Sequence, residues 1–364
     1  MRRSRAWLLR VLALSLGAVV VVSALNFAID PLQHYRAATF YKTVYKGSRY
    51  LNPGLAKTHD YDTALFGTSM VQNTRPSQVD RVLGVRSVKL AMPGATAHEL
   101  GVLLGTTLRA GRVRRVILAL DLFSFPGGVD EDWIGDEGLP LYLYDDDPWN
   151  DINYLANWET LAMGMKAVRA VFRQSKGDLR RADPDFYGYW GNKFTYTTER
   201  MLKRWEWRLF RDNVRKQDWS LARMRRNFEV NLLPYMRAAP GVRFDLYWPP
   251  YSILAWIDIR ETGSLATALA FKRAVLEDVS DLPNVRVYDF QPVASITHDL
   301  ANYKDETHYA PKINDWVIEQ IGAEAHVMTP ANAEARLRDL EQQARSWTLD
   351  RPAAKASDPP RDAP

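Results

Sequence analysis

The sequence of 364 residues contains no cysteine. This absence excludes a disulfide scaffold, a thiolate zinc site, an iron–sulfur cluster and a cysteine nucleophile. It also lacks a glycine-rich phosphate loop of either the G-x-G-x-x-G or the Walker A type, and its six histidines show no metal-ligand spacing such as H-E-x-x-H. We therefore expect neither a cofactor nor a metal.

Excess charge of one sign is also missing outside the first ten residues. The formal net charge of +5 owes much to four arginines that precede the first apolar run, and without them 44 basic residues face 43 acidic ones. These four are Arg2, Arg3, Arg5 and Arg10. A balanced remainder argues against nucleic acid as a partner. A hydrophobic content of 46% is typical of a folded globular chain.

The stretch from Val11 to Ile29 carries no charge. As a helix its 19 residues would be about 28 Å long, close to the thickness of the bilayer's hydrocarbon core. The arginines on its N-terminal side predict a cytoplasmic N-terminus and a domain on the periplasmic or extracellular side. The alternative is a signal peptide cleaved near Val22-Ser23-Ala24. Because the apolar run continues beyond that point, the sequence favours an uncleaved single-pass anchor over residues 1–29.

Strand-like and helix-like stretches alternate along most of the remaining chain. Short apolar runs predict strands, and apolar positions at helical spacing predict helices. The predicted strands are 62–66, 87–91, 113–120, 242–248 and 285–289, and the predicted helices are 77–83, 97–110, 221–237, 264–279 and 312–322. This pattern predicts an α/β fold, a doubly wound, mainly parallel sheet of about five strands with helices on both faces.

The predicted domain spans residues 61–328. A juxtamembrane segment, 30–60, precedes it, and a helical, aromatic-rich insertion follows the third strand at about 126–220. Residues 329–364 are expected to form a surface helix over 331–346 and then a flexible tail.

Two short patterns lie where parallel sheets bind ligands, beyond the carboxyl ends of strands. Gly67-Thr68-Ser69 follows the first strand, and Asp305-Glu306-Thr307-His308 precedes the last helix. A serine hydroxyl needs an adjacent base to act as a nucleophile, and a carboxylate can orient a histidine for that role. The alternatives are a helix N-cap for the first pattern and a capping Asp with a surface His for the second.

The two patterns together resemble the SGNH (GDSL-like) hydrolase superfamily. The resemblance implies a flavodoxin-like fold with Ser69 as nucleophile, His308 as base and Asp305 as the residue that orients it. A further block, Ala91 to Ala95, matches the one whose glycine joins the oxyanion hole, which implies that the N–H groups of Ser69 and Gly94 hold the oxyanion. One block departs, because Asp121 stands where the superfamily has an asparagine, and an ionised carboxylate cannot donate a hydrogen bond.

The anchored layout resembles exported proteins of alginate O-acetylation and DltD-like proteins. This implies a serine esterase or O-acyltransferase, with acetyl as the expected acyl group, that acts outside the cytoplasm on a polysaccharide. The implied partners are a glycan or acyl-ester substrate, the membrane and a membrane-bound acyltransferase. A second hypothesis stays open: a catalytically inactive member of the fold that binds glycan or scaffolds an assembly complex.

Several other residues near the predicted site have two interpretations. Trp248 and Tyr251 follow the fourth strand at the same edge, so they form either a substrate wall or a rigid turn packed on the core. Tyr303 and Tyr309 flank the second pattern and are expected to shield it from water, while Asp121 positions other groups or caps its strand. His98 and Glu99 are expected to be a surface pair, and Asp145 to Asp147 a solvated acidic loop.

Overall fold

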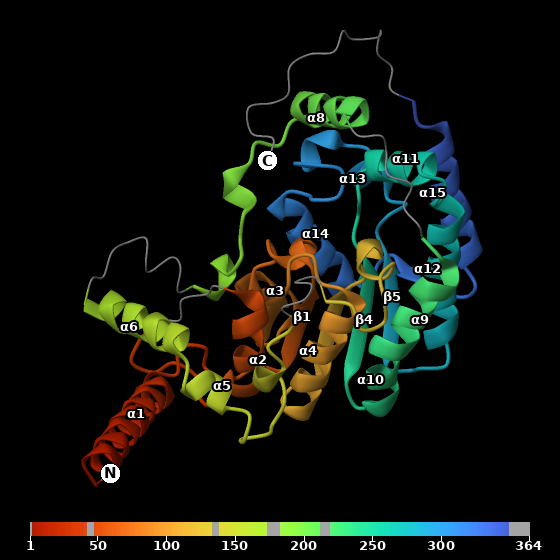
Figure 1. Cartoon of the computed structure of the whole chain (residues 1–364). Coiled ribbons are helices and arrows are strands. Elements are labelled where there is room, and N and C mark those ends of the chain that lie inside the picture. Colours follow the sequence, from red (N-terminus) through yellow and green to blue (C-terminus); the bar gives the residue numbers. More distant parts are fainter. Residues whose placement is uncertain (1, 42–46, 133–137, 173–182, 212–218, 349–364) are drawn as a thin grey trace.

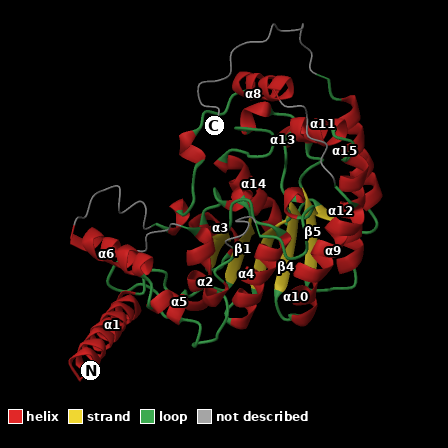
Figure 2. Ribbon diagram, in the orientation of Figure 1, coloured by secondary structure: helices red, strands yellow, loops and turns green. Residues whose placement is uncertain are grey.

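The structure, a computed structural model, describes residues 2–41, 47–132, 138–172, 183–211 and 219–348. Figures 1 and 2 show one sheet between two layers of helices, with a single helix projecting from one corner. The expected flexible tail beyond residue 348 lies outside the described residues.

The sheet has six strands in the order β2-β1-β3-β4-β5-β6. The first five are parallel, and the short β6 pairs antiparallel with β5. They are β1 (Thr63–Gly67), β2 (Ser87–Ala91), β3 (Arg115–Ala119), β4 (Arg243–Trp248), β5 (Val285–Asp289) and β6 (Val327–Met328). The five predicted strands are thus confirmed within one to two residues, and the two-residue β6 was not predicted.

Alternate residues of the strands enter two separate cores. Phe66 and Leu118 pack on one face, whereas Leu65 and Ile117 pack on the other. Because both faces of the sheet are covered by helices, the strands appear in the sequence as continuous apolar runs. The face of Leu65 is covered by α3 (Pro76–Leu83) and α14 (Pro311–Gly322).

The opposite face carries most of the remaining helices. Helices that contribute buried residues to its core include α2 (Ser48–Thr58), α4 (Ala97–Arg109), α9 (Leu221–Asn231), α10 (Leu233–Ala238), α11 (Ile253–Glu261), α12 (Leu265–Val279) and α15 (Ala333–Ser346). The helix predicted over 221–237 is divided into α9 and α10 because Pro234 lies in the first turn of α10 and cannot continue α9.

The predicted insertion contains α5 (Ile152–Leu155), α6 (Trp158–Phe172) and α8 (Thr198–Arg211), and the short α13 (Ala294–Thr297) follows β5. In Figure 1, α8 lies at the opposite end of the molecule from the N-terminal helix. The side chain of Trp205 on α8 donates a 3.0 Å hydrogen bond to Asp258 on α11. The insertion therefore reaches back onto the domain on the side of α11.

The projecting helix is α1 (Arg2–Ile29), which is long and apolar enough to cross a membrane. Its last turn, however, belongs to the domain. Asn26 is fully buried, and its side-chain amide donates 2.8 Å hydrogen bonds to the carbonyl groups of Leu155 and Asn157. The predicted span of 11–29 lies within this helix. At its end Asn26 and Ile29 are buried where α1 contacts α5 and α6, whereas Phe27 is 48% exposed.

Candidate active site

Ser69 lies two residues beyond the end of β1, the strand that pairs with β2 on one side and with β3 on the other. The turn depends on Gly67, which adopts a φ of 151°. A Cβ atom at Gly67 would come within 2.5 Å of the Val71 side chain and 2.8 Å of Ala119. Only glycine fits this position, so the chain can turn at once into the 3-10 helix Ser69–Val71 that presents the serine.

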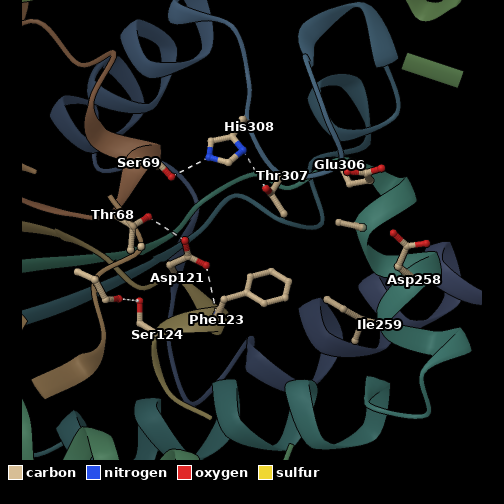
Figure 3. Close-up of a pocket in the computed structure, with 13 residues that line it drawn as sticks. Thr68, Ser69, Asp121, Phe123, Ser124, Asp258, Ile259, Glu306, Thr307 and His308 are labelled. Atoms are coloured by element: carbon tan, nitrogen blue, oxygen red, sulfur yellow. Dashed lines mark hydrogen bonds between the residues drawn. The ribbon is translucent and has the colours of Figure 1, made fainter. Parts of the chain in front are cut away.

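The structure brings Ser69, His308 and Asp305 together (Figure 3 shows the first two). The hydroxyl of Ser69 lies 2.7 Å from Nε2 of His308, and Nδ1 of His308 lies 2.8 Å and 3.0 Å from the two carboxylate oxygens of Asp305. The serine–histidine pair is separated by 239 positions in the chain. This is the relay expected of a nucleophile, a base and the group that orients the base.

The carboxylate of Asp305 is held by more than the imidazole ring. The backbone N–H groups of Thr307 and His308 donate to the same oxygen at 3.1 Å and 2.8 Å. Burial opposes ionisation of Asp305, but the charge and hydrogen bonds of His308 and the nearby Lys304 outweigh it and hold the pKa of this carboxyl well below its usual range. Asp305 is therefore an anion that fixes the orientation of the ring.

Gly94 faces the same pocket from the turn after β2. The N–H of Met92 donates to the carbonyl of Gly67 at 2.8 Å, and the N–H of Ala95 donates to Met92 at 3.1 Å. These bonds set the turn beside Ser69, and Gly94 takes the left-handed φ of 67° that the turn requires. The N–H of Ser69, as the first residue of its 3-10 helix, has no acceptor within that helix.

Asp121 lies beside the nucleophile turn rather than at a free strand end. Its carboxylate accepts a 2.8 Å hydrogen bond from the Thr68 hydroxyl and a 3.2 Å bond from the N–H of Phe123 (Figure 3). It also accepts a bond from the Tyr251 hydroxyl. Burial and the charge of Asp121 raise the pKa of Tyr251 well above its ordinary value, so that the tyrosine stays a donor. Asp121 thus both caps its 3-10 helix and holds the residue before Ser69.

These residues share a pocket of about 440 Å³. Its lining side chains come from the ends of β1 and β3, from α11 and from the chain before α14 (Figure 3). Beyond those already described, the lining includes Phe123, Ser124, Asp258, Ile259 and Glu306. The volume is large enough for an acyl group together with part of an alcohol.

The four aromatic residues predicted at this edge do not form a substrate wall. Trp248 and Tyr251 are fully buried, and Tyr303 and Tyr309 are each 1% exposed. Tyr303 donates to the carbonyl of Pro250 at 2.8 Å, and Tyr251 supports Asp121 from behind. These residues pack the core beneath the site because both faces of the sheet are covered by helices.

Two other aromatic side chains, which were not predicted from the sequence, lie beside the site. Phe123 is 44% exposed and lines the pocket. Trp190, from the insertion, packs edge-on against the His308 ring with 5.6 Å between ring centroids. The backbone N–H of Trp190 donates to the side chain of Asn73 at 3.1 Å, which fixes this part of the insertion beside the turn that carries Ser69.

The prediction that Glu99 lies at the surface beside His98 is wrong. This carboxylate is fully buried and pairs with Arg49 at 2.6 Å and 2.7 Å. Glu99 also completes a capping box with Thr96 at the start of α4. Because Arg49 donates to the carbonyl of Pro93 at 3.2 Å, the pair supports the turn that carries Gly94.

Comparison with known proteins does not assign the chain to a family. No protein-family model matches the chain, and no curated protein sequence matches it. Among the described residues, no group of three or more histidine, aspartate and glutamate side chains could hold a metal ion. The functional argument therefore rests on the arrangement of the site.

Proposed function

We propose that this protein is a serine esterase or O-acyltransferase of the SGNH type. The observation that carries the proposal is the 2.7 Å contact between the Ser69 hydroxyl and Nε2 of His308, with Asp305 on the other ring nitrogen. The three groups meet in a pocket beyond the carboxyl end of β1, where the strand order 2-1-3-4-5 places its switch point.

The proposed acylation starts with His308 as general base. Nε2 accepts the Ser69 proton while Oγ attacks the acyl carbonyl, and the ion pair between Asp305 and the protonated ring stabilises the charge that forms. The N–H groups of Ser69 and Gly94 hold the oxyanion. Collapse of the tetrahedral intermediate breaks the bond to the alcohol, which leaves with the proton from His308, and Ser69 carries the acyl ester.

The second half-reaction transfers the acyl group to an oxygen nucleophile. His308 removes a proton from that nucleophile, its oxygen attacks the acyl-Ser69 carbonyl, and the Ser69 hydroxyl is restored. Water as the nucleophile gives an esterase, and a sugar hydroxyl gives a transferase. Phe123, which is 44% exposed and lines the pocket, offers an apolar face that suits a sugar ring, and the buried Trp190 packs against His308 and limits access of water to that ring.

The proposed substrate is an acylated polysaccharide, or the acyl donor for one, on the outer side of a membrane. The support for this setting is α1, which is long and apolar enough to span a bilayer and has arginines at its N-terminal end. A membrane-bound acyltransferase as partner remains part of the proposal.

A serine-reactive fluorophosphonate probe tests the proposed nucleophile. We expect the full chain to be labelled, Ser69→Ala to lose the label and Ser124→Ala to keep it. Ser124 is the matched control because it lines the same pocket but donates to the carbonyl of Ala95. Labelling of Ser69→Ala would refute the assignment. A wild-type chain that takes no label and cleaves no acyl ester, yet binds glycan as Ser69→Ala does, would instead support the non-catalytic binding role.

A further inference from the structure

Exposed large apolar side chains outside α1 are concentrated in two stretches of the chain, and elements from one of them, α5 and α6, contact α1. Outside α1, all the large apolar side chains exposed in the described ranges lie in residues 40–50 or 141–165, except Phe123, Leu221 and Val230. The most exposed are Trp149 at 87% and Trp158 at 73%, and Ile152 is 53% exposed. We call Trp149, Ile152 and Trp158 the α5 surface. A solvated domain surface rarely carries such a cluster without a partner.

Hydrogen bonds fix the position of the α5 surface along α1. The buried side chain of Asn26 donates to the carbonyl groups of Leu155 and Asn157 at 2.8 Å each. Ile152 begins the one-turn helix that ends at Leu155, and Trp158 directly follows Asn157. Ile152 and Trp158 therefore lie within about one helical turn of the level of Asn26, and Trp149 precedes Ile152 by three residues.

Besides the hydrogen bonds of Asn26, α1 contacts the domain through α6, which lies across the end of α1 in Figure 1. Gly164 faces Ile29 so closely that an added Cβ atom would come within 3.1 Å of it, and Ala167 packs into the same small apolar cluster. The exposed residues of α6 include Lys166 and Arg169 and, in its first turn, Glu159, besides its apolar residues. An apolar helix side flanked by basic residues is typical of helices that lie in a membrane interface.

The length of α1 before its contact with the domain determines how close α5 and α6 come to a bilayer that α1 spans. Asn26 is the first buried residue of α1, so the uncharged stretch that precedes the contact with the domain is residues 11–25, and beyond it only Phe27 and Ala28 are exposed. Fifteen residues rise only about 22 Å, against about 30 Å for the hydrocarbon core. A short span draws the flanking residues toward the membrane, and tryptophan is the side chain that the interface favours most.

We infer that the α5 surface is a membrane-docking surface, seated in the lipid headgroup region of the bilayer that α1 spans. Its occupant is the phospholipid of the leaflet from which the domain emerges. Two attachments, the helix and this surface, fix the orientation of the domain, and the α8 end of the molecule faces away from the bilayer (Figure 1). The inference rests on insertion of α1 and is independent of the chemistry at Ser69.

The absence of cysteine allows a direct test with single labels. Ile152→Cys, Ala335→Cys and Leu14→Cys are each labelled with nitrobenzoxadiazole, and the full chains are reconstituted in phosphatidylcholine vesicles that contain spin-labelled phosphatidylcholine. Ala335 is the matched control, an exposed position on α15. Circular dichroism checks that each chain is folded.

We expect a spin label near the headgroup to quench the probe at position 152 and to leave the probe at 335 unchanged, while a label deep in the acyl chains quenches the probe at 14. In the double variant Trp149→Ala/Trp158→Ala, quenching at position 152 should fall. If position 152 behaves like 335 while position 14 is quenched, the α5 surface lies in water, open to a protein partner, and the inference is wrong. A probe at 14 that no lipid label reaches would overturn it as well, because α1 would then not be inserted.

Discussion

The substitution Asp121→Asn is the strictest test of the proposed mechanism, because it changes the hydrogen-bonding groups beside Ser69. In the structure one oxygen of Asp121 accepts from the Thr68 hydroxyl, and the other accepts from Tyr251 and from the N–H of Phe123. An asparagine of the same shape keeps its oxygen for Tyr251 and Phe123 and turns its amide nitrogen toward Thr68. One N–H can then donate to the Thr68 hydroxyl, and the second N–H is left to donate into the pocket beside Ser69.

The expected effects on stability and on rate have opposite signs. A hydrogen bond to a charged group stabilises by about 1.5–3 kcal/mol and one between neutral groups by about 0.5–1.5 kcal/mol, so the free energy of unfolding should fall by about 1 kcal/mol. A well-placed oxyanion donor, by contrast, is worth about 10² to 10³ in rate. Because the bond between the amide and Thr68 fixes the direction of the second N–H, that donor is less freely placed than an optimised one, and we expect acylation about tenfold to a hundredfold faster than in the wild type.

The assay is the second-order rate of fluorophosphonate labelling, together with the initial rate of hydrolysis of an acetyl ester, and Asp121→Ala is the matched control. The alanine removes the support of Thr68 and supplies no donor, so it should slow both reactions. An Asp121→Asn variant that is folded and reacts no faster than the wild type would refute the reasoning, because the side chain would then not face the developing oxyanion.

Three further substitutions test the surroundings of the site. Asp305→Asn removes the charge behind His308 and should slow acylation by a factor on the order of 10³, measured as labelling rate, and a rate near the wild-type value would contradict the relay. Arg49→Met leaves Glu99 buried without its partner and should lower the free energy of unfolding by about 3 kcal/mol in urea titrations, whereas the double variant Arg49→Met/Glu99→Gln should lose less. An equal loss of unfolding free energy in the single and the double variant would refute the stabilising role of the Arg49–Glu99 ion pair. Burial lowers the pKa of Lys89 from 10.5 to about 7, so between these values the unfolded chain binds more protons there and the residue's contribution to stability rises with pH. The difference in unfolding free energy between wild type and Lys89→Met should therefore shift in favour of the wild type from pH 7 to pH 9, by up to about 1.4 kcal/mol per pH unit, and a constant difference would contradict this.

The parallel sheet was predictable from sequence because each of its strands is buried on both faces. Such strands appear as short, continuous apolar runs, of which residues 115–119 are the clearest. The antiparallel β6 has only two residues and therefore no periodicity to detect. The split between α9 and α10 could have been read from Pro234, whereas the burial of Asn26 could not, because its two acceptors lie some 130 positions further along the chain.

The site, like the fold, has residues that could be predicted from local sequence and residues whose positions depend on contacts between distant segments. Ser69, Asp305 and His308 were predictable because turn geometry and three-residue spacing are local features, and the topology of a parallel sheet brings turns at its carboxyl edge together. The surroundings depend on contacts between distant segments. Glu99 has the sequence of an exposed helix start, yet Arg49, fifty positions earlier, makes it a buried anchor for the Gly94 turn. Trp190 is one of twelve tryptophans, and its packing against His308 follows from how the insertion docks on Asn73. Sequence could thus propose the reacting groups, while the residues that position them and bound the pocket required the fold.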